Sequence, residues 1–345
     1  MHHVIVRLIA IAGFFFGALP AHAQAPEQPG VKFTLEWAFQ GPQSIFTYAA
    51  ESGAFKSEGL TVQVDRGSGS ADAVSRVATG TYEFGWAEMS AVIKFNADHP
   101  ERPLMAVYVT HENSANAVMS IKGRGISVPK DLEGKKVGST AGSAARDVFD
   151  AFARINGFDP GKIKTETVSG ALRETMLVRG DVDAILGATT SGVFTIKSLG
   201  TRMEDIIVMP YGKFGVELYG HALITTAAYA ERNPKTVAAF VKAVNKSLVA
   251  AIANPKAAVA SLKARDGLVN LDLENDRLLL MLRDMVVTPT TRAEGLGTVS
   301  PVRMKKTMQS IYDAYGIKTV PAPEKVYTDR FLPPKAERIP PALGA

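Results

Sequence analysis

The sequence of 345 residues contains no cysteine. This absence excludes disulfide bonds, thiolate metal sites, a cysteine nucleophile and the acylated N-terminal cysteine of a lipoprotein. Blocks of one charge are missing as well, because the net charge is only +5 and the basic residues are scattered along the chain. Without a basic patch interleaved with aromatic residues, we do not expect nucleic acid as a partner.

Sequence signatures of catalysis are also missing. Gly67 and Gly69 lack the third glycine of a dinucleotide-binding fingerprint, because residue 72 is an aspartate. His111 is followed by Glu112 but not by the second histidine of a zinc protease, and there is no Gly-x-Ser-x-Gly elbow. We therefore expect no cofactor, no metal and no enzymatic activity.

Long apolar runs are limited to one segment near the N-terminus. Residues 8–19 form an apolar run of 12 residues, and a small-x-small cleavage pattern follows at residues 21–23. This run is shorter than the ~20 residues that span a bilayer, and no later apolar stretch reaches that length. We interpret residues 1–23 as a cleaved secretory signal peptide and expect a soluble periplasmic protein, most simply a monomer.

What the sequence does contain is a regular alternation of strand and helix patterns. Strands are predicted at 31–37, 60–65, 82–86, 103–109, 117–121, 135–139, 163–167, 182–186, 206–209 and 218–225. The longer predicted helices are 43–56, 88–95, 143–156, 171–179, 191–199, 234–253, 255–264, 273–286 and 301–315, and an extended, proline-rich tail is expected after residue 321. Such an order indicates an α/β protein with parallel sheets and helical crossovers.

Two such α/β series follow one another, and a helical block comes last. The first lobe would consist of residues 31–112 plus 220–330, and the second lobe of residues 113–219. The chain would pass between the lobes twice, near 110–117 and 216–222. Two crossover segments of this kind form a hinge, and a ligand would bind in the cleft between the lobes.

The stretch from Gly134 to Arg146 is the first candidate site. A strand, a turn of small residues and a helix start predict bare backbone amides that could hold an anionic or acceptor-rich ligand. Ser139, Thr140 and Ser143 add hydroxyl groups there. Arg146 is unusual in a first helical turn and would suit a nearby negative group. The alternative is an ordinary helix N-cap with a solvated arginine.

Further candidates follow the predicted strands, where ligands of open α/β sheets bind. Trp37 and Trp86 end two strands, and each is either a ligand platform or a residue that caps the core. Glu88 is the only acid that we weigh in this group; it either accepts hydrogen bonds from a ligand amine or stabilises the next helix. The remaining candidates at strand ends and crossovers are Gln40, Gly67, Ser68, Ser70, Gly187 and Tyr211.

Three segments resemble a known family. They are Tyr48–Leu60 (YAAESGAFKSEGL), Val77–Gly85 (VATGTYEFG) and Asp131–Gly138 (DLEGKKVG). Together with Trp37 they resemble periplasmic substrate-binding proteins of ABC importers, in the group that binds sulfonates, taurine, nitrate and thiamine-pyrimidine precursors. The resemblance covers residues 31–259.

The resemblance implies a two-lobed periplasmic-binding-protein fold, type II-like, that closes on a small solute and delivers it to a membrane permease. It also implies a site at residues 37–40, 67–70, 88 and 139–143. Two ligand classes stay open: a sulfonate or carboxylate held by helix amides, and a pyrimidine-like amine held by aromatic rings and Glu88. The alternative functions are a periplasmic sensor and an enzyme of thiamine-pyrimidine biosynthesis, although that branch uses cysteine.

Overall fold

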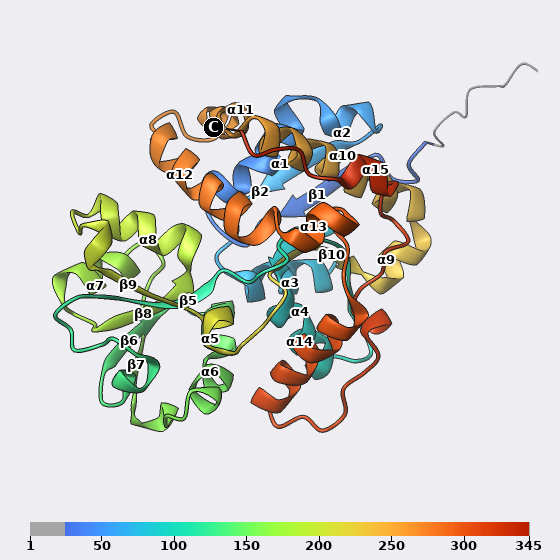
Figure 1. Ribbon diagram of the computed structural model, residues 1–345. Coiled ribbons are helices and arrows are strands. Elements are labelled where there is room, and N and C mark those ends of the chain that lie inside the picture. Colours follow the sequence, from blue (N-terminus) through green and yellow to red (C-terminus); the bar gives the residue numbers. More distant parts are fainter. Residues whose placement is uncertain (1–24, 345) are drawn as a thin grey trace, which may run out of the picture.

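A computed structural model describes residues 25–344 and shows two α/β lobes (Figure 1). The predicted signal peptide, residues 1–23, lies outside the described residues. Each lobe is built around a five-stranded sheet, and we call them lobe 1 and lobe 2 in the order in which the chain enters them. The expected two-lobed α/β architecture is thereby confirmed.

The sheet of lobe 1 has the strand order β2-β1-β3-β10-β4. Its neighbours pair in parallel except around β10, which runs antiparallel to both β3 and β4. β3 is buried along its whole length, as expected of a strand covered by helices on both faces. The strands are β1 (Gly30–Thr34), β2 (Thr61–Asp65), β3 (Phe84–Glu88), β4 (Leu104–Val109) and β10 (His221–Thr226).

The sheet of lobe 2 repeats this plan with the order β7-β6-β8-β5-β9. Here β5 is the antiparallel strand, paired with β8 and β9. In each sheet, therefore, the antiparallel strand is the one that follows a crossover from the other lobe. The strands are β5 (Asn116–Ile121), β6 (Lys136–Ser139), β7 (Lys164–Thr167), β8 (Ala184–Ala188) and β9 (Ile206–Pro210).

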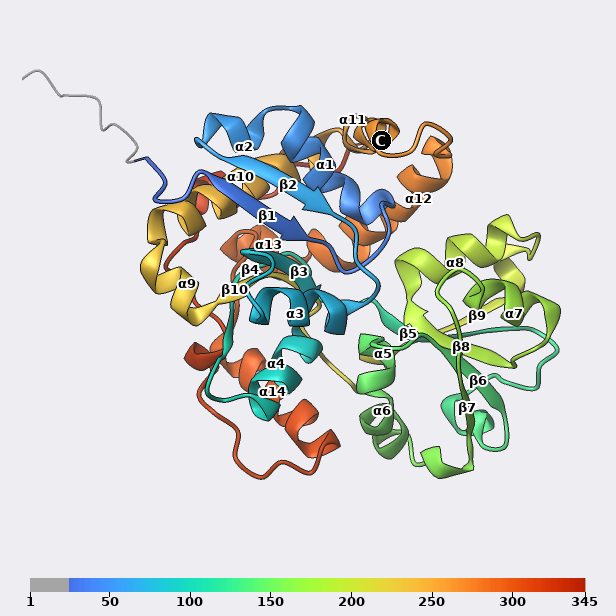
Figure 2. The same cartoon turned by 180° about the vertical axis from the view of Figure 1, so that it is seen from behind.

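Helices pack against the sheet of each lobe, and Figure 2 shows α1 and α10 next to β1 and β2. In lobe 1 the early helices are η1 (Gly41–Gln43), α1 (Ser44–Glu51), α2 (Ala54–Ser57), α3 (Ser70–Ala78) and α4 (Met89–Asp98). In lobe 2 they are η2 (Pro129–Leu132), α5 (Ala144–Asp147), α6 (Phe149–Ile155), η3 (Pro160–Lys162), α7 (Arg173–Arg179), α8 (Thr189–Ser198), η4 (Met203–Asp205) and η5 (Tyr211–Phe214).

The C-terminal helices return to lobe 1. They are α9 (Ala227–Arg232), α10 (Pro234–Ala253), α11 (Pro255–Ala260), η6 (Ser261–Ala264), α12 (Leu271–Met281), the π-helical η7 (Leu282–Val286), α13 (Pro289–Glu294), α14 (Pro301–Ala314), η8 (Pro323–Lys325) and α15 (Lys335–Arg338). Among the described helices, only α10 is long and apolar enough to cross a membrane. However, 61% of its most apolar 18-residue stretch is buried inside the protein, as in a core helix.

The two crossovers, residues 110–115 and 215–220, run side by side and bond to each other. The Gly220 amide donates to the His111 carbonyl at 3.0 Å, and the Ser114 amide donates to the Leu218 carbonyl at 3.2 Å. A Cβ on Gly220 would lie 2.7 Å from the Asn113 carbonyl oxygen, so only glycine permits this close approach. The domain boundaries predicted at 112/113 and 219/220 lie within these crossovers and stay predictions.

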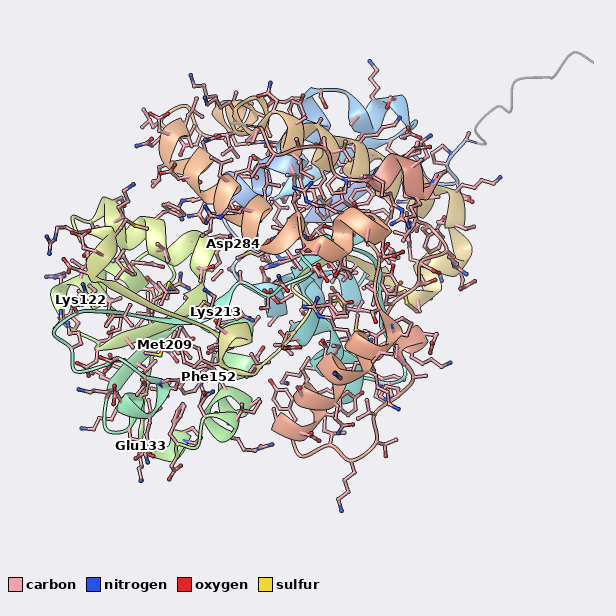
Figure 3. The ribbon with its side chains drawn as sticks, viewed as in Figure 1. Lys122, Glu133, Phe152, Met209, Lys213 and Asp284 are labelled. Carbon is pink, nitrogen blue, oxygen red and sulfur yellow. The ribbon has the colours of Figure 1, made fainter. Side chains whose placement is uncertain are left out.

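Some predicted elements differ in detail. The helix expected over residues 143–156 is interrupted at Val148, which separates α5 from α6. At this point the Tyr211 hydroxyl donates to the Ala145 carbonyl (2.9 Å) and the Tyr315 hydroxyl donates to the Asp147 carbonyl (2.6 Å). These side chains compete with the helical amides for the carbonyl oxygens. Phe152 of α6, which is labelled in Figure 3, stacks on Tyr211 with 4.5 Å between ring centroids.

The end of the chain differs too. The tail after residue 321 is not simply extended, because η8 and α15 form within it and Phe331 is buried. Arg338 is only 8% exposed and donates to the Leu296 and Pro333 carbonyls, which fixes the tail against lobe 1. The third strand also ends two residues later than predicted, at Glu88, so Trp86 lies inside β3.

Candidate functional site

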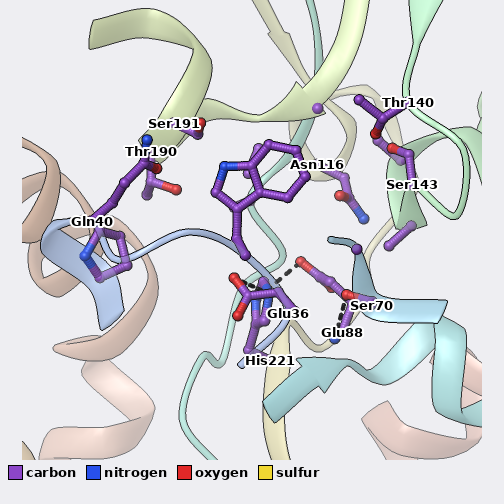
Figure 4. A pocket seen from close by; sticks show the side chains of 18 of the residues that line it. Glu36, Gln40, Ser70, Glu88, Asn116, Thr140, Ser143, Thr190, Ser191 and His221 are labelled. Carbon is purple, nitrogen blue, oxygen red and sulfur yellow. Dashed lines mark hydrogen bonds and ion pairs between the residues drawn. The ribbon is translucent and has the colours of Figure 1, made fainter. Parts of the chain in front are cut away.

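A cavity lies between the two lobes, next to the crossovers (Figure 4). Lobe 1 and the crossovers contribute Glu36, Trp37, Gln40, Pro42, Gln43, Gly69, Ser70, Trp86, Glu88, His111, Ala115 and His221. Lobe 2 contributes Asn116, Thr140, Ser143, Ala144, Ala145, Arg173, Gly187, Ala188, Thr190 and Ser191. The cavity is thus enclosed by strand ends and helix starts of both sheets, as the sequence predicted for the cleft.

The lobe 1 side of the cavity holds two carboxylates around one imidazole. His221 Nε2 lies 3.5 Å from Glu36 Oε1, and His221 Nδ1 lies 3.4 Å from Glu88 Oε1. All three residues are at least nine-tenths buried. The Ser114 hydroxyl, 3.2 Å from both Glu88 oxygens, and the Gln43 amide, 2.9 Å from Glu36 Oε1, hold the two carboxylates in place.

Burial and charge act in opposite directions on these groups. Burial lowers the pKa of His221, but the carboxylates of Glu88 and Glu36 outweigh this effect, so that the pKa is raised above its ordinary value. Burial raises the pKa of Glu88, although His221 and Ser114 partly offset it. Burial and the charge of His221 hold the pKa of His111 well below its usual range. Of the two histidines in the cavity wall, His221 is therefore the one that takes up a proton more readily.

Three buried polar atoms in the cavity wall have no hydrogen-bond partner among residues 25–344. They are Glu36 Oε2, His221 Nδ1 and Asn116 Nδ2. Leaving such a group unsatisfied costs about 1–3 kcal/mol, and more for a charged group. Because all three line the same cavity, a ligand that bonds to them would recover this free energy. They define an acceptor on Glu36 and a donor on Asn116 as the unfilled positions.

Trp37 connects the lobes across the cavity. It leaves lobe 1 after β1, and its ring tip would lie 2.5 Å from a Cβ at Gly170 of lobe 2, so a side chain at that position would displace the ring. The Arg173 guanidinium of lobe 2 lies 5.7 Å from the centre of the Trp37 ring. Trp86, in contrast, is 1% exposed and donates its Nε1–H to Thr110 Oγ1 at 2.8 Å. Trp86 is thus mainly a core residue, whereas Trp37 is only partly buried, and its role as a ligand platform stays a prediction.

The lobe 2 side is mostly uncharged. Thr140 and Ser143 precede α5, while Thr190 and Ser191 lie in the first turn of α8. In Figure 4, Thr140 and Ser143 lie on one side of the cavity and Thr190 and Ser191 on the other, with Glu36, Glu88 and His221 below them. Arg173 is the cation of this wall, but its guanidinium is bonded to the equally buried Glu174, which neutralises most of its charge.

The structure brings together seven of the twelve residues that the sequence singled out. Trp37, Gln40, Ser70, Glu88, Thr140, Ser143 and Gly187 line the cavity. Ser70 also accepts a hydrogen bond from the Glu88 amide at 3.1 Å, which aligns α3 with the end of β3. Their roles in ligand binding stay predictions.

The other five residues do not line the cavity. Gly67 faces the Leu35 carbonyl, where a Cβ would lie 2.1 Å away, and the Ser68 hydroxyl donates to Asp72 (3.0 Å). Arg146 forms an ion pair with Asp150 at 3.1 Å. The remaining two are buried elsewhere: Ser139 at the end of β6 and Tyr211 in the core of lobe 2.

Sequence reasoning missed Glu36, Asn116, Arg173 and His221. Glu36 corrects our treatment of Glu88 as the only acid at these strand ends, and it was detectable as a carboxylate directly before the candidate Trp37. His221 could have been found as the counterpart of His111 on the second predicted crossover. Arg173 carried no signal, because an arginine at the start of a helix is usually solvated. Within residues 25–344 no group of three or more potential ligands could hold a metal ion.

Solved structures with the same arrangement define the class of fold. The alkanesulfonate-binding protein SsuA from Xanthomonas axonopodis, bound to MOPS, is 16% identical, with a TM-score of 0.67 over 88% of this chain and 100% of that one. The nitrate-binding protein NrtA from Synechocystis is 14% identical (TM-score 0.64, 93% of both chains). A Candida albicans protein with the generic periplasmic binding protein fold is also 14% identical (TM-score 0.65, 88% and 97%). This chain therefore has the periplasmic-binding-protein fold.

The family follows from the sequence itself. Residues 42–258 match the family described as NMT1/THI5 like, which is more than half of the chain, and this protein belongs to that family. The family assignment agrees with the resemblance seen in the sequence. A search of curated protein sequences gave no match.

Proposed function

We propose that this protein is the periplasmic solute-binding component of an ABC importer, and that its solute is a small pyrimidine-like amine. The observation that carries the choice of solute is the buried pair of carboxylates around His221, with Glu36 Oε2 left as a free acceptor. A ligand that donates an amino N–H there would gain a hydrogen bond to a charged group, worth about 1.5–3 kcal/mol.

An anionic solute is the competing class, because two of the structural neighbours are sulfonate- and nitrate-binding proteins. Three features of this chain argue against it. Glu36 and Glu88 would repel an anion in the buried cavity. The helix start proposed as an anion seat belongs to α5, which is only four residues long and has a correspondingly small dipole. The one lining arginine, Arg173, is already paired with Glu174.

The rest of the proposal concerns how the protein works. The hinge formed by residues 110–115 and 215–220 would open and close the cavity, and the closed form would be recognised by a permease in the inner membrane. Cleavage after residue 23 would release a monomer into the periplasm. Trp37 would stack on the solute ring, and Asn116 would donate to an acceptor atom at its other end.

The test is a thermal-shift panel on the mature protein with aminopyrimidines, alkanesulfonates, aromatic carboxylates and nitrate. A true ligand at a hundredfold excess over its dissociation constant should stabilise the protein by ~2.7 kcal/mol. We expect aminopyrimidines to raise the melting temperature and sulfonates to leave it unchanged. Stabilisation by sulfonates alone would overturn the choice of solute but keep the receptor.

One observation favours a second candidate function. A buried imidazole between two carboxylates could move protons, so an enzyme of thiamine-pyrimidine biosynthesis is the alternative. Small-angle scattering with a ligand from the panel, run beside a product assay, distinguishes the two. A receptor should become more compact and return the ligand intact, whereas chemical conversion of the ligand would favour the enzyme.

A further inference from the structure

Helix α12 of lobe 1 packs against helix α8 of lobe 2 and carries a buried arginine into the contact. The two Nη groups of Arg277 donate to the carbonyls of Thr190 (3.0 Å) and Ser191 (2.5 Å) and to Thr195 Oγ1 (2.9 Å). Arg277 is only 3% exposed. Because Thr190 and Ser191 line the cavity, an arginine of one lobe holds a wall of the cavity that belongs to the other lobe.

The charge of Arg277 is balanced from both sides. Glu274, on the same helix, lies 3.2 Å from Arg277 Nε and also accepts the Gly41 amide at 2.6 Å. Beyond α8, Arg173 and Glu174 form a second buried pair within lobe 2. Each lobe thus carries its own arginine–glutamate pair into the contact. Of these two buried pairs, only the one in lobe 1 reaches the other lobe, through the bonds from Arg277 to α8.

We propose that Arg277 is a positioning residue that fixes the α8 wall of the cavity and raises ligand affinity without touching the ligand. When the lobes separate, Arg277 loses its bonds to α8 and regains water, while its pair with Glu274 stays within lobe 1. The bonds to α8 therefore favour the closed form alone, and a ligand that needs the closed form binds more tightly. The part of this inference that concerns affinity depends on the proposed function.

The absence of cysteine makes a direct test of lobe closure possible without any ligand. Leu199→Cys and Leu268→Cys, at exposed positions beside the α8–α12 contact, would carry two spin labels on opposite lobes. We expect Arg277→Gln to shift the measured distances toward longer values than in the labelled parent. Arg277→Lys, which keeps the charge but loses the forked donor geometry, should give an intermediate result and serves as the second variant if Arg277→Gln fails to fold.

The matched control lies on the same two helices. Lys197 of α8 and Asp276 of α12 form an exposed ion pair at 3.6 Å. Asp276→Asn removes this pair and should leave the distances unchanged, because exposed ion pairs contribute little. Identical distance distributions in the parent and both Arg277 variants would overturn the proposal.

Affinity is measured separately, with 4-aminopyrimidine as the probe. Arg277→Gln should weaken binding ~10–100-fold, the range expected from losing hydrogen bonds to a charged group, mainly through faster dissociation. Asp276→Asn should bind as the parent does. If the parent fails to bind the probe, the proposed solute is wrong, and the label distances still decide the role of Arg277. If the parent binds the probe, an unchanged affinity in Arg277→Gln would contradict the proposed effect of Arg277 on ligand binding.

Discussion

The two lobes present opposite chemistry to the same cavity. Lobe 1 supplies Glu36, Glu88 and His221, all buried and all able to carry charge. Lobe 2 supplies hydroxyl groups, and its arginine is already neutralised by Glu174. A charged group gives strong, direction-dependent contacts, whereas hydroxyls adapt to either a donor or an acceptor. We infer that lobe 1 selects the solute and that lobe 2 mainly encloses it.

The charged side of the cavity also lies next to the two crossovers between the lobes. His111 and His221 lie on or beside the two crossovers, and both line the cavity with ring centroids 5.0 Å apart. If the crossovers act as the proposed hinge, the charged end of the cavity is built on the part of the molecule that would move least when the lobes rotate. A solute could bind to lobe 1 first, and lobe 2 would then close over it.

The largest effect should come from lobe 1. Glu36→Gln keeps the shape but removes the negative charge and the free acceptor, so affinity for an amine should fall by about 1.5–3 kcal/mol. Isothermal titration with the best aminopyrimidine measures this. Glu58→Gln is the control, because Glu58 is similarly buried but binds Lys242 and Lys246 away from the cavity. Equal losses in both variants would show a general effect on folding.

The corresponding test of lobe 2 is Ser143→Leu. Ser143 lines the cavity and makes no side-chain cap bond to α5, so a leucine would fill space that a ligand needs. Overpacking of this kind costs about 1–3 kcal/mol, which should appear as weaker binding of every member of the panel. Ser143→Ala should bind nearly normally. If Ser143→Leu changed the order of preference among ligands, lobe 2 would take part in selection.

A change of pH should have a smaller effect, and the stability of the fold and the affinity for a cationic ligand should change in opposite directions. The raised pKa of His221 means that its stabilisation of the fold is fully present below about pH 6.5 and is lost as pH rises through the raised pKa. Affinity for a cationic ligand of constant charge should instead increase over the same range, by at most about tenfold per pH unit, because the competing proton leaves. Both trends should disappear in His221→Gln, measured by thermal unfolding and titration.

Much of the fold was predictable because it depends on local patterns. All ten predicted strands form, and both crossovers lie where the strand series is interrupted. The interrupted helix was not predictable, because the hydroxyls that take its carbonyls come from Tyr211 and Tyr315, which are distant in the sequence. The docking of Arg338 on the carbonyls of residues 296 and 333 depends on tertiary contacts in the same way.

The site was predictable only in part, for a related reason. Residues at strand ends or a few residues beyond them, such as Glu88, Trp37 and Ser143, reach the cavity because strand ends meet there. Arg173 reaches it through the packing of α7, which no spacing in the sequence reveals. His221 lies on a predicted crossover, but its place between two carboxylates depends on the pairing of β10 with β3. The sequence patterns therefore identified residues near strand ends, but they missed several of the charged residues in the cavity wall.

The smallest effect is expected at Arg146, for which the sequence left two roles open, an anion-binding residue or a solvated arginine. Its guanidinium pairs with Asp150 and lies 5.8 Å from the ring centre of Phe149, and it does not line the cavity. Arg146→Gln should therefore change affinity for any solute by no more than a screened, partly exposed charge does, about 0–1 kcal/mol. Titration of Arg146→Gln beside Glu36→Gln, at low and high salt, measures the difference. A large loss at Arg146 with an anion, together with no loss at Glu36, would mean that lobe 2 is the selective lobe after all.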